Sequence, residues 1–123
     1  MNNTEAVKKL MMMQKEIGLV DTLYFYFRKN IRVNIGLGER YCKLSIDELM
    51  LSVRSHNALR RANINTLGEL VFRLNEGNLK TIRNLGAKSY SEIQTKILVY
   101  AFELLSDQEK LEFFYYLSEN NVA

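Results

Sequence analysis

Apolar residues recur near the start of the chain with the spacing of an α-helix. Steps of three and four residues separate Leu10, Met13, Ile17, Val20, Tyr24, Phe27 and Ile31. This alternation is typical of a helix that packs along one stripe against a neighbour. A second apolar set widens the stripe: Met12, Leu19, Leu23 and Tyr26. The pattern predicts a long helix from Glu5, with a bend at Gly18, that packs on more than one neighbour.

The middle of the sequence predicts a string of short helices, because signals for helix starts recur there. Ser45, Thr66 and Ser89 are each followed three residues later by a glutamate, the pattern of a capping box, and Ser52 is a further cap. The expected helices cover residues 46–50, 53–62, 67–74 and 88–104, with a tight turn at 84–86. Short helices need a shared core. The candidates are Leu49, Val53, Leu59, Ile64, Leu67, Leu70, Val71, Leu79, Ile82, Leu85, Ile93 and Ile97.

The end of the sequence predicts one more helix, capped by Ser106 and carrying aromatic residues on several sides. A surface helix rarely leaves so many aromatic rings exposed, so we expect it to pack against the first helix. A contact between two copies of the protein is the alternative for both terminal helices. The protein is therefore predicted to be all-α, with a helical extension at 1–43, a compact domain of several helices at 44–105 and an amphipathic helix at 106–123.

Composition narrows the classes of function. One cysteine, Cys42, and one histidine, His56, exclude an internal disulfide, a cysteine zinc site and a multi-histidine metal site. No metal or cofactor is therefore expected, and a cytoplasmic location fits best. No run of 18 apolar residues is present, so no membrane partner is expected. The sequence has neither a Walker-type glycine loop nor a nucleophile elbow, which indicates that the protein is not an enzyme.

Two segments of the middle zone carry candidate chemistry. At residues 84–89 a tight turn leads into a helix start, where free amides, Lys88 and Ser89 suit a phosphate. A plain helix–turn–helix corner with a solvated lysine is the alternative. In the other segment, Arg54 and Asn57 are three residues apart and project from one helix face. They suit the narrow minor groove of A·T-rich DNA, and an exposed polar face is the alternative.

Taken together, these segments resemble a known family. Residues 52–59 read S-V-R-S-H-N-A-L, and residues 84–93 read N-L-G-A-K-S-Y-S-E-I. Their order and separation are similar to those in the C-terminal domain of the bacterial RNA polymerase alpha subunit, over about residues 42–100. The resemblance implies a helical domain with a helix-hairpin-helix. It also implies binding to the minor groove of A·T-rich DNA and contacts with sigma factors and activators.

The resemblance assigns DNA-binding roles to both segments. Arg54 would enter the minor groove, and Asn57 would contact sugar or base edges beside it. Gly86, Lys88 and Ser89 would hold the phosphate backbone. Two helix starts, each with a cation, would then face the two walls of one groove.

The resemblance also assigns roles to residues at which this sequence matches the family pattern less well. Glu92 would orient or contact the DNA-binding surface, and Ala58 stands where the family has a cysteine at the DNA face. Asp47 and Glu48 match part of the acidic patch that contacts sigma, whereas Met50 replaces an acidic residue there. About 43 residues precede the match. We therefore expect a free-standing relative of this domain that does not assemble polymerase.

The leading hypothesis is a transcription-associated protein that binds double-stranded DNA. The alternative is an adaptor or decoy that keeps the fold, binds RNA polymerase, sigma or a regulator, and does not bind DNA. A third hypothesis is a structural helical oligomer built by the terminal helices. A homodimer through those helices would raise the avidity of a single weak domain for DNA.

Overall fold

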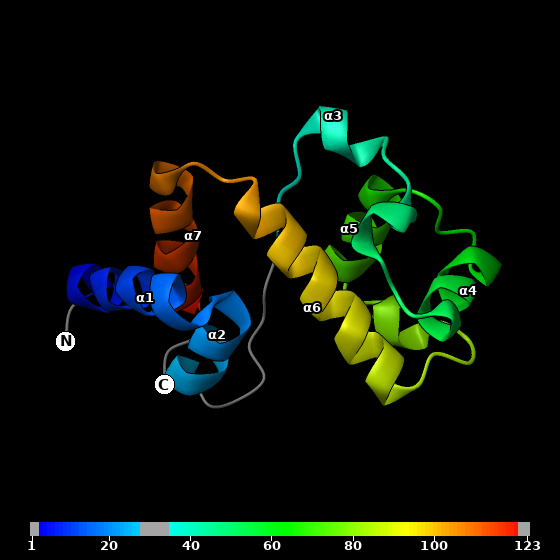
Figure 1. Cartoon of the computed structure of the whole chain (residues 1–123), viewed down its shortest axis with the longest axis horizontal. Helices are drawn as coiled ribbons and strands as arrows, with labels where there is room; N and C mark the ends of the chain where they lie inside the picture. Colours follow the sequence, from blue (N-terminus) through cyan, green and yellow to red (C-terminus); the bar gives the residue numbers. More distant parts are fainter. Residues whose placement is uncertain (1–2, 28–34, 121–123) are drawn as a thin grey trace. The chain divides into compact units, whose positions relative to one another are not determined.

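The computed structural model describes residues 3–27 and 35–120, and within these ranges every regular element is helical (Figure 1). Short 3-10 helices are labelled η. The elements are α1 (Asn3–Ile17), α2 (Leu19–Phe27), α3 (Glu39–Cys42), η1 (Ile46–Leu49), α4 (Val53–Arg61), α5 (Leu67–Asn75), η2 (Leu79–Thr81), α6 (Ala87–Glu103) and α7 (Asp107–Asn120). An isolated bridge joins Ser45 to Thr66, but the described residues form no strand. The all-α prediction is confirmed.

The described elements fall into two compact units. Unit 1 comprises Met1–Val33 and Phe102–Ala123, and unit 2 comprises Asn34–Ala101. The boundary falls inside α6, whose last two residues belong to unit 1. Both ends of the sequence thus contribute to unit 1, while the division into three zones at residues 43 and 105 stays a prediction.

Gly18 separates α1 from α2 and does not merely bend one helix. Its φ of +88° lies in the left-handed region, which interrupts the helical backbone. The single long helix predicted from Glu5 is therefore wrong, and Ile31 lies outside the described residues. The predicted apolar stripe fails on both sides of the break, since Ile17, Val20 and Tyr24 are all exposed. Of the α1 and α2 side chains whose burial is described, the buried ones are Ala6, Val7, Leu10, Met11, Leu19, Thr22 and Leu23.

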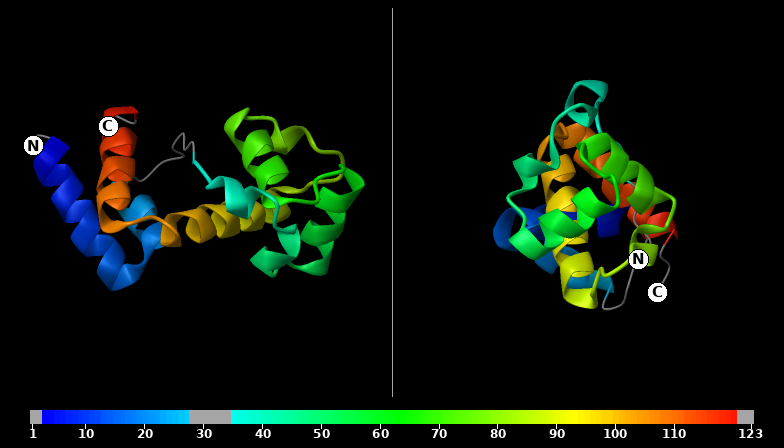
Figure 2. Two further views of the ribbon diagram at one scale, coloured as in Figure 1. Left: turned by 90° about the horizontal axis from the view of Figure 1, so that it is seen from above. Right: turned by 90° about the vertical axis from the view of Figure 1, so that its right-hand side faces the viewer.

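Helix α7 packs against α1, as predicted (Figure 2). The hydroxyl groups of Thr4 and Tyr115 are hydrogen-bonded at 2.9 Å. Phe102 meets Phe113 and Phe114 edge-on, with ring centroids 5.5 and 5.6 Å apart. This geometry brings the positive edge of one ring to the negative face of another. Some of the aromatic residues of the last helix therefore pack in the core of unit 1.

The capping box predicted at Thr66 is present, and the cap predicted at Ser106 is a second box. The Thr66 hydroxyl accepts a hydrogen bond from the Glu69 amide at 3.2 Å, and the Glu69 carboxylate accepts one from the Thr66 amide at 3.1 Å. Ser106 makes the same reciprocal pair with the glutamate three residues on. Ser45 instead caps the 3-10 helix η1: its hydroxyl accepts a hydrogen bond from the Asp47 amide at 3.1 Å, and not from the Glu48 amide. The box predicted there is wrong.

The core of unit 2 lies between α6 and the shorter helices around it (Figures 1 and 2). Ile93 and Ile97 of α6 are fully buried, and ten of the twelve predicted core residues are buried. Val53 is wrong: its side chain is 77% exposed, because it opens α4 on the solvent side. Leu85 is half-buried in the turn before α6. The prediction missed Ile46, Ala58, Leu74, Leu98 and Ala101, all buried.

Gly68 sets how closely α5 approaches α3. A Cβ at this position would lie 2.8 Å from the Cβ and 3.0 Å from the carbonyl oxygen of Cys42. We expect Gly68→Ala to destabilise unit 2 by about 1–3 kcal/mol, because the added methyl overpacks two backbones. Urea unfolding followed by circular dichroism measures this loss. Gly36→Ala is the matched control, because a Cβ there meets nothing within 4 Å, and an equal loss in both variants would contradict the prediction.

Candidate nucleic-acid interface

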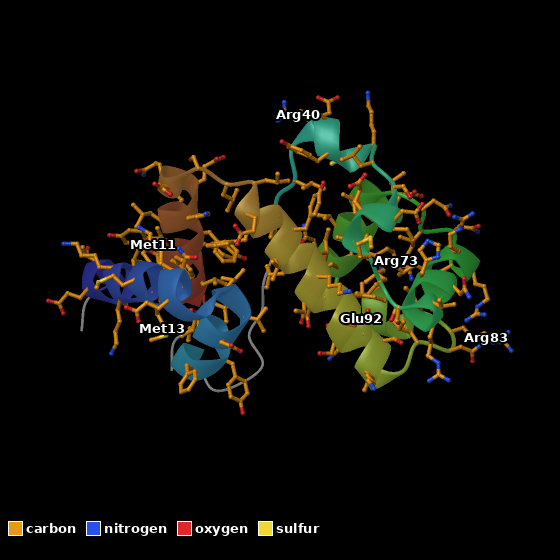
Figure 3. The ribbon with its side chains drawn as sticks, viewed as in Figure 1. Met11, Met13, Arg40, Arg73, Arg83 and Glu92 are labelled. Atoms are coloured by element: carbon orange, nitrogen blue, oxygen red, sulfur yellow. The ribbon has the colours of Figure 1, made fainter. Side chains whose placement is uncertain are left out.

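Glu92 of α6 holds the first turn of α4 (Figure 3). Its Oε2 accepts a hydrogen bond from the Ser52 amide at 2.8 Å. Its Oε1 accepts from the hydroxyls of Ser52 and Ser55 at 2.8 and 2.5 Å. Ser52 caps α4 as predicted, because its hydroxyl accepts from the Ser55 amide. Lys96 lies 3.5 Å from the same carboxylate and donates to the Met50 carbonyl at 2.6 Å. The position of α4 therefore depends on α6.

The capping box predicted at Ser89 is wrong, because the Glu92 carboxylate is hydrogen-bonded to Ser52 and Ser55 instead. Helix α6 already begins at Ala87, and Glu92 serves a helix start that lies 40 residues away in the sequence. The hydrogen bond from Ser55, followed by that from the Ser52 amide, lowers the pKa of Glu92 from 4.5 to about 2. The carboxylate is thus an internal anion at the N-terminal end of α4, which partly neutralises the positive end of that helix.

Helix α4 presents two of the predicted DNA-binding side chains. Arg54 and Asn57 are both exposed, and residues three apart share one face of a helix. Ala58, predicted with them, is 1% exposed. Each step along a helix rotates by about 100°, which turns Ala58 into the core beside Leu59. The predicted DNA contact of Ala58 is therefore wrong.

His56 links α4 to η1. Its Nε2 lies 2.7 Å from Oδ1 of Asp47, and this hydrogen bond is the main cause that lowers the pKa of Asp47. Asp47 and Glu48, the predicted protein contacts, are both exposed. A basic partner that approaches Asp47 would therefore meet a carboxylate that is already hydrogen-bonded to His56.

The start of α6 is open to solvent. Asn84, with a φ of +66°, provides the left-handed residue of the preceding turn. Gly86 needs no such conformation, and a Cβ on it would meet nothing within 4 Å. The Tyr90 amide bonds to the Gly86 carbonyl at 2.9 Å, so the amides of residues 87–89 precede the first bond within the helix. Lys88 is exposed beside them, and no described carboxylate is hydrogen-bonded there.

The two helix starts lie close together. Glu92 is one helical turn beyond Lys88, and it is hydrogen-bonded to Ser52 at the start of α4. Two exposed cations near the hairpin, Lys80 and Arg83, are absent from the predicted set. Figure 3 shows Arg83 extended outward at the margin of unit 2. The absence of carboxylates from the sequence around them is the signal that could have revealed both.

Other chemistry is sparse in residues 3–27 and 35–120. No three side chains of His, Cys, Asp or Glu gather there where they could hold a metal ion. None of the helices in these ranges combines the length and the apolar character needed to cross a bilayer. The thiol of Cys42 is half-buried and donates to the Leu37 carbonyl at 3.4 Å. The exposed polar groups around the starts of α4 and α6 are therefore the candidate site.

The same region of the sequence matches a known family. Residues 37–98 match the family described as the C-terminal domain of the bacterial RNA polymerase alpha chain, and these 62 residues are half of the protein. The protein belongs to this family. Its family domain, residues 37–98, lies within unit 2 and contains every predicted site residue. Membership associates the protein with transcription.

The curated relatives are DNA-directed RNA polymerase alpha subunits. That of Symbiobacterium thermophilum is 48% identical over 62 residues, which are 50% of this protein and 19% of the relative. Those of Moorella thermoacetica and Clostridium acetobutylicum are 46% and 44% identical over 71 residues, 58% of this protein and 22% of each relative. The match thus spans about a fifth of the length of these relatives. No solved structure matches the protein.

Proposed function

We propose that the family domain of this protein binds double-stranded DNA in transcription, through the minor groove of A·T-rich sequence. One observation carries the proposal: Arg54 and Asn57 project from a helix that Glu92 fixes beside the open start of α6 with Lys88. A narrow A·T-rich groove concentrates negative potential that attracts arginine. The free amides of a helix start suit the phosphates that flank it. We therefore expect both kinds of group to share one surface.

The contacts divide between the two helices. Arg54 enters the groove, and Asn57 contacts sugar or base edges beside it. Gly86, Lys88 and Ser89 hold the phosphate backbone. Since Ser89 is only 7% exposed, it acts mainly through its amide at the helix start. The domain has a binding role and no catalytic one.

Gly86 provides a test of how closely a phosphate approaches α6. A Cβ at Gly86 would meet nothing within 4 Å, and the φ of Gly86 is not left-handed. Gly86→Ala should therefore lower the free energy of unfolding by less than about 1 kcal/mol. The methyl group would stand between the amides and a phosphate, and we expect roughly a five- to tenfold loss of DNA affinity, within the range of one good polar contact. Titration by fluorescence anisotropy measures the affinity, and thermal unfolding reports the fold. Unchanged affinity would show that no phosphate reaches this position.

The deciding experiment compares two duplexes. The protein of 123 residues is titrated into labelled A·T-rich and G·C-rich duplexes of equal length, each at about 50 and 200 mM salt. We expect tighter binding to the A·T-rich duplex and a marked loss of affinity at the higher salt, because phosphate contacts release counterions. Equal affinity for the two duplexes would contradict minor-groove reading.

The same experiment separates the alternative function. Absence of binding to either duplex at about 50 mM salt would overturn the proposal and favour an adaptor or decoy. Pull-downs with RNA polymerase and with sigma would then identify its partner. Whether or not the protein binds DNA, we propose that Asp47 and Glu48 contact sigma or a regulator. Charge reversal of Glu48 is the variant to use there, because its side chain is exposed and Asp47 is already hydrogen-bonded to His56.

The terminal helices suggest a second copy of the protein as a partner. The outward face of α2 carries Val20 and Tyr24, 37% and 75% exposed, with Asp21 as the one charged residue of the helix. Apolar outward faces of this kind are typical of contact surfaces. We propose that two copies form a homodimer through unit 1. We also propose that the protein is located in the cytoplasm. Light scattering coupled to size-exclusion chromatography at micromolar concentration would refute the dimer by giving the mass of one copy.

A further inference from the structure

The hairpin before α6 is a strongly basic segment. Residues 77–91 include three cations, Lys80, Arg83 and Lys88, and no carboxylate. All three cations are exposed. Of these, only Lys88 lies at the helix start already considered. The other two extend the positive surface along η2 and the turn.

Packing of the hairpin directs these two cations outward. Leu79 and Ile82 are buried, 1% and 7% exposed, and they anchor η2 and the turn to the core of unit 2. Lys80 and Arg83 each follow one of these anchors and are exposed. Figure 3 shows Arg83 reaching beyond the ribbon. The core thus fixes the outward direction of both side chains.

The backbone that carries them is held by local hydrogen bonds. The Thr81 hydroxyl donates to the Asn78 carbonyl at 2.6 Å, and the Leu85 amide donates to the Ile82 carbonyl at 3.1 Å. Asn84 occupies the left-handed region, which asparagine tolerates better than most residues. A segment ordered in this way loses little conformational freedom when it binds a ligand.

Lys80 is also held by an aromatic ring. Its Nζ lies 5.1 Å from the ring centroid of Tyr90, within the range of a cation–π contact. Tyr90 is two residues beyond Lys88 on α6. The ring therefore holds the ammonium group of Lys80 near the start of α6, on the same hairpin.

We propose that Lys80 and Arg83 contact the phosphate backbone of the bound DNA beyond the phosphates held at the start of α6. This inference rests on the proposed function, since it extends the same surface. The ligand is the DNA backbone, because both side chains lie on the hairpin that leads to the start of α6, where the phosphates are proposed to bind, and contacts to phosphate carry no sequence information. Both contacts should therefore act equally on A·T-rich and G·C-rich duplexes.

The salt dependence of binding tests the proposal. The original protein and the double variant Lys80→Gln with Arg83→Gln are titrated into the A·T-rich duplex between about 50 and 200 mM salt. Each phosphate contact contributes about 0.9 to the slope of log K against log salt. We expect the slope of the double variant to be smaller in magnitude by about 1.8. At the lower salt concentration its affinity should fall roughly tenfold for each contact that is lost. Circular dichroism should show an unchanged fold, because both side chains are exposed.

The matched control is the double variant Lys43→Gln with Lys110→Gln. It also removes two positive charges, but from other positions, and Lys110 lies 5.1 Å from a ring centroid, that of Phe102. We expect its slope to equal that of the original protein. An equal loss of slope in both double variants would assign the effect to net charge and overturn the proposal.

Two further outcomes distinguish the inference from the function on which it rests. If the original protein binds DNA but the Lys80 and Arg83 variant keeps its slope, the inference alone fails. If the original protein does not bind DNA at about 50 mM salt, the proposed function fails and the inference fails with it.

Discussion

Arg54→Ala is expected to remove most of the DNA affinity of the protein. One arginine inserted in a groove contributes roughly 1–3 kcal/mol, so the loss should be about 5- to 150-fold. The preference for A·T-rich over G·C-rich DNA should disappear with it, because the narrow groove attracts the guanidinium. Anisotropy titrations with both duplexes measure the two effects. The fold should be unaffected, since Arg54 is exposed.

Controls on the same surface separate position from charge. Arg61→Ala removes an exposed arginine from the last turn of α4, and we expect it to change the affinity less than about threefold. Lys88→Ala should weaken binding to both duplexes alike and reduce the salt slope by about 1. Equal losses for Arg54→Ala and Arg61→Ala would show that α4 contributes only general positive charge.

Glu92→Gln is expected to destabilise unit 2 in a pH-dependent way. The pKa of Glu92 is lowered from 4.5 to about 2 in the folded protein, chiefly by the hydrogen bond from Ser55. A lowered pKa means that the ionised carboxylate stabilises the fold at pH values above about 4.5, and that this stabilisation is lost as the pH falls towards about 2. After allowance for solvent screening, we expect about 1–2 kcal/mol at neutral pH.

Urea unfolding at neutral pH and at about pH 2.5 measures this difference. The free energies of unfolding of the original protein and of Glu92→Gln should differ at neutral pH and converge at the acidic pH, because the stabilisation from the ionised carboxylate is then mostly lost. Glu76→Gln, at the end of α5, removes an exposed carboxylate and should show no such convergence. A constant difference across pH would mean that the hydrogen-bond geometry, and not the charge, carries the effect.

The same variant tests whether Glu92 positions Arg54. If Glu92 acts through α4, then Glu92→Gln weakens DNA binding in the original protein but adds no further loss to Arg54→Ala. A residue that touches DNA by itself would give additive losses. A carboxylate facing phosphates would even raise the affinity when it is neutralised.

Local signals predicted those helix starts whose partners are close in the sequence. Thr66 and Ser106 each form a box with a glutamate three residues on, and both boxes are present. The same pattern failed at Ser89, because Glu92 is hydrogen-bonded to Ser52 and Ser55 instead. A capping pattern states which bonds a helix start can make, but it does not state which distant donors compete for the carboxylate.

Helical periodicity predicted burial well in the middle zone and poorly in the first helices. The prediction held for most apolar positions of the middle zone, including Ile93 and Ile97 on α6. It failed along the first stripe, where Ile17 before Gly18 and Val20 and Tyr24 after it are exposed, and at Val53, where α4 begins. Periodicity assumes an unbroken helix, so each break removes its basis.

The sequence by itself determined the all-α class, most of the core and the family, because apolar spacing, capping residues and two short motifs are local properties. It also singled out Arg54, Asn57 and Lys88. Only the tertiary structure decided that Ala58 is buried, that Glu92 holds α4, and that the cations of the hairpin face outward. These facts depend on contacts between helices far apart in the sequence, and the directions of side chains across such contacts are set by packing.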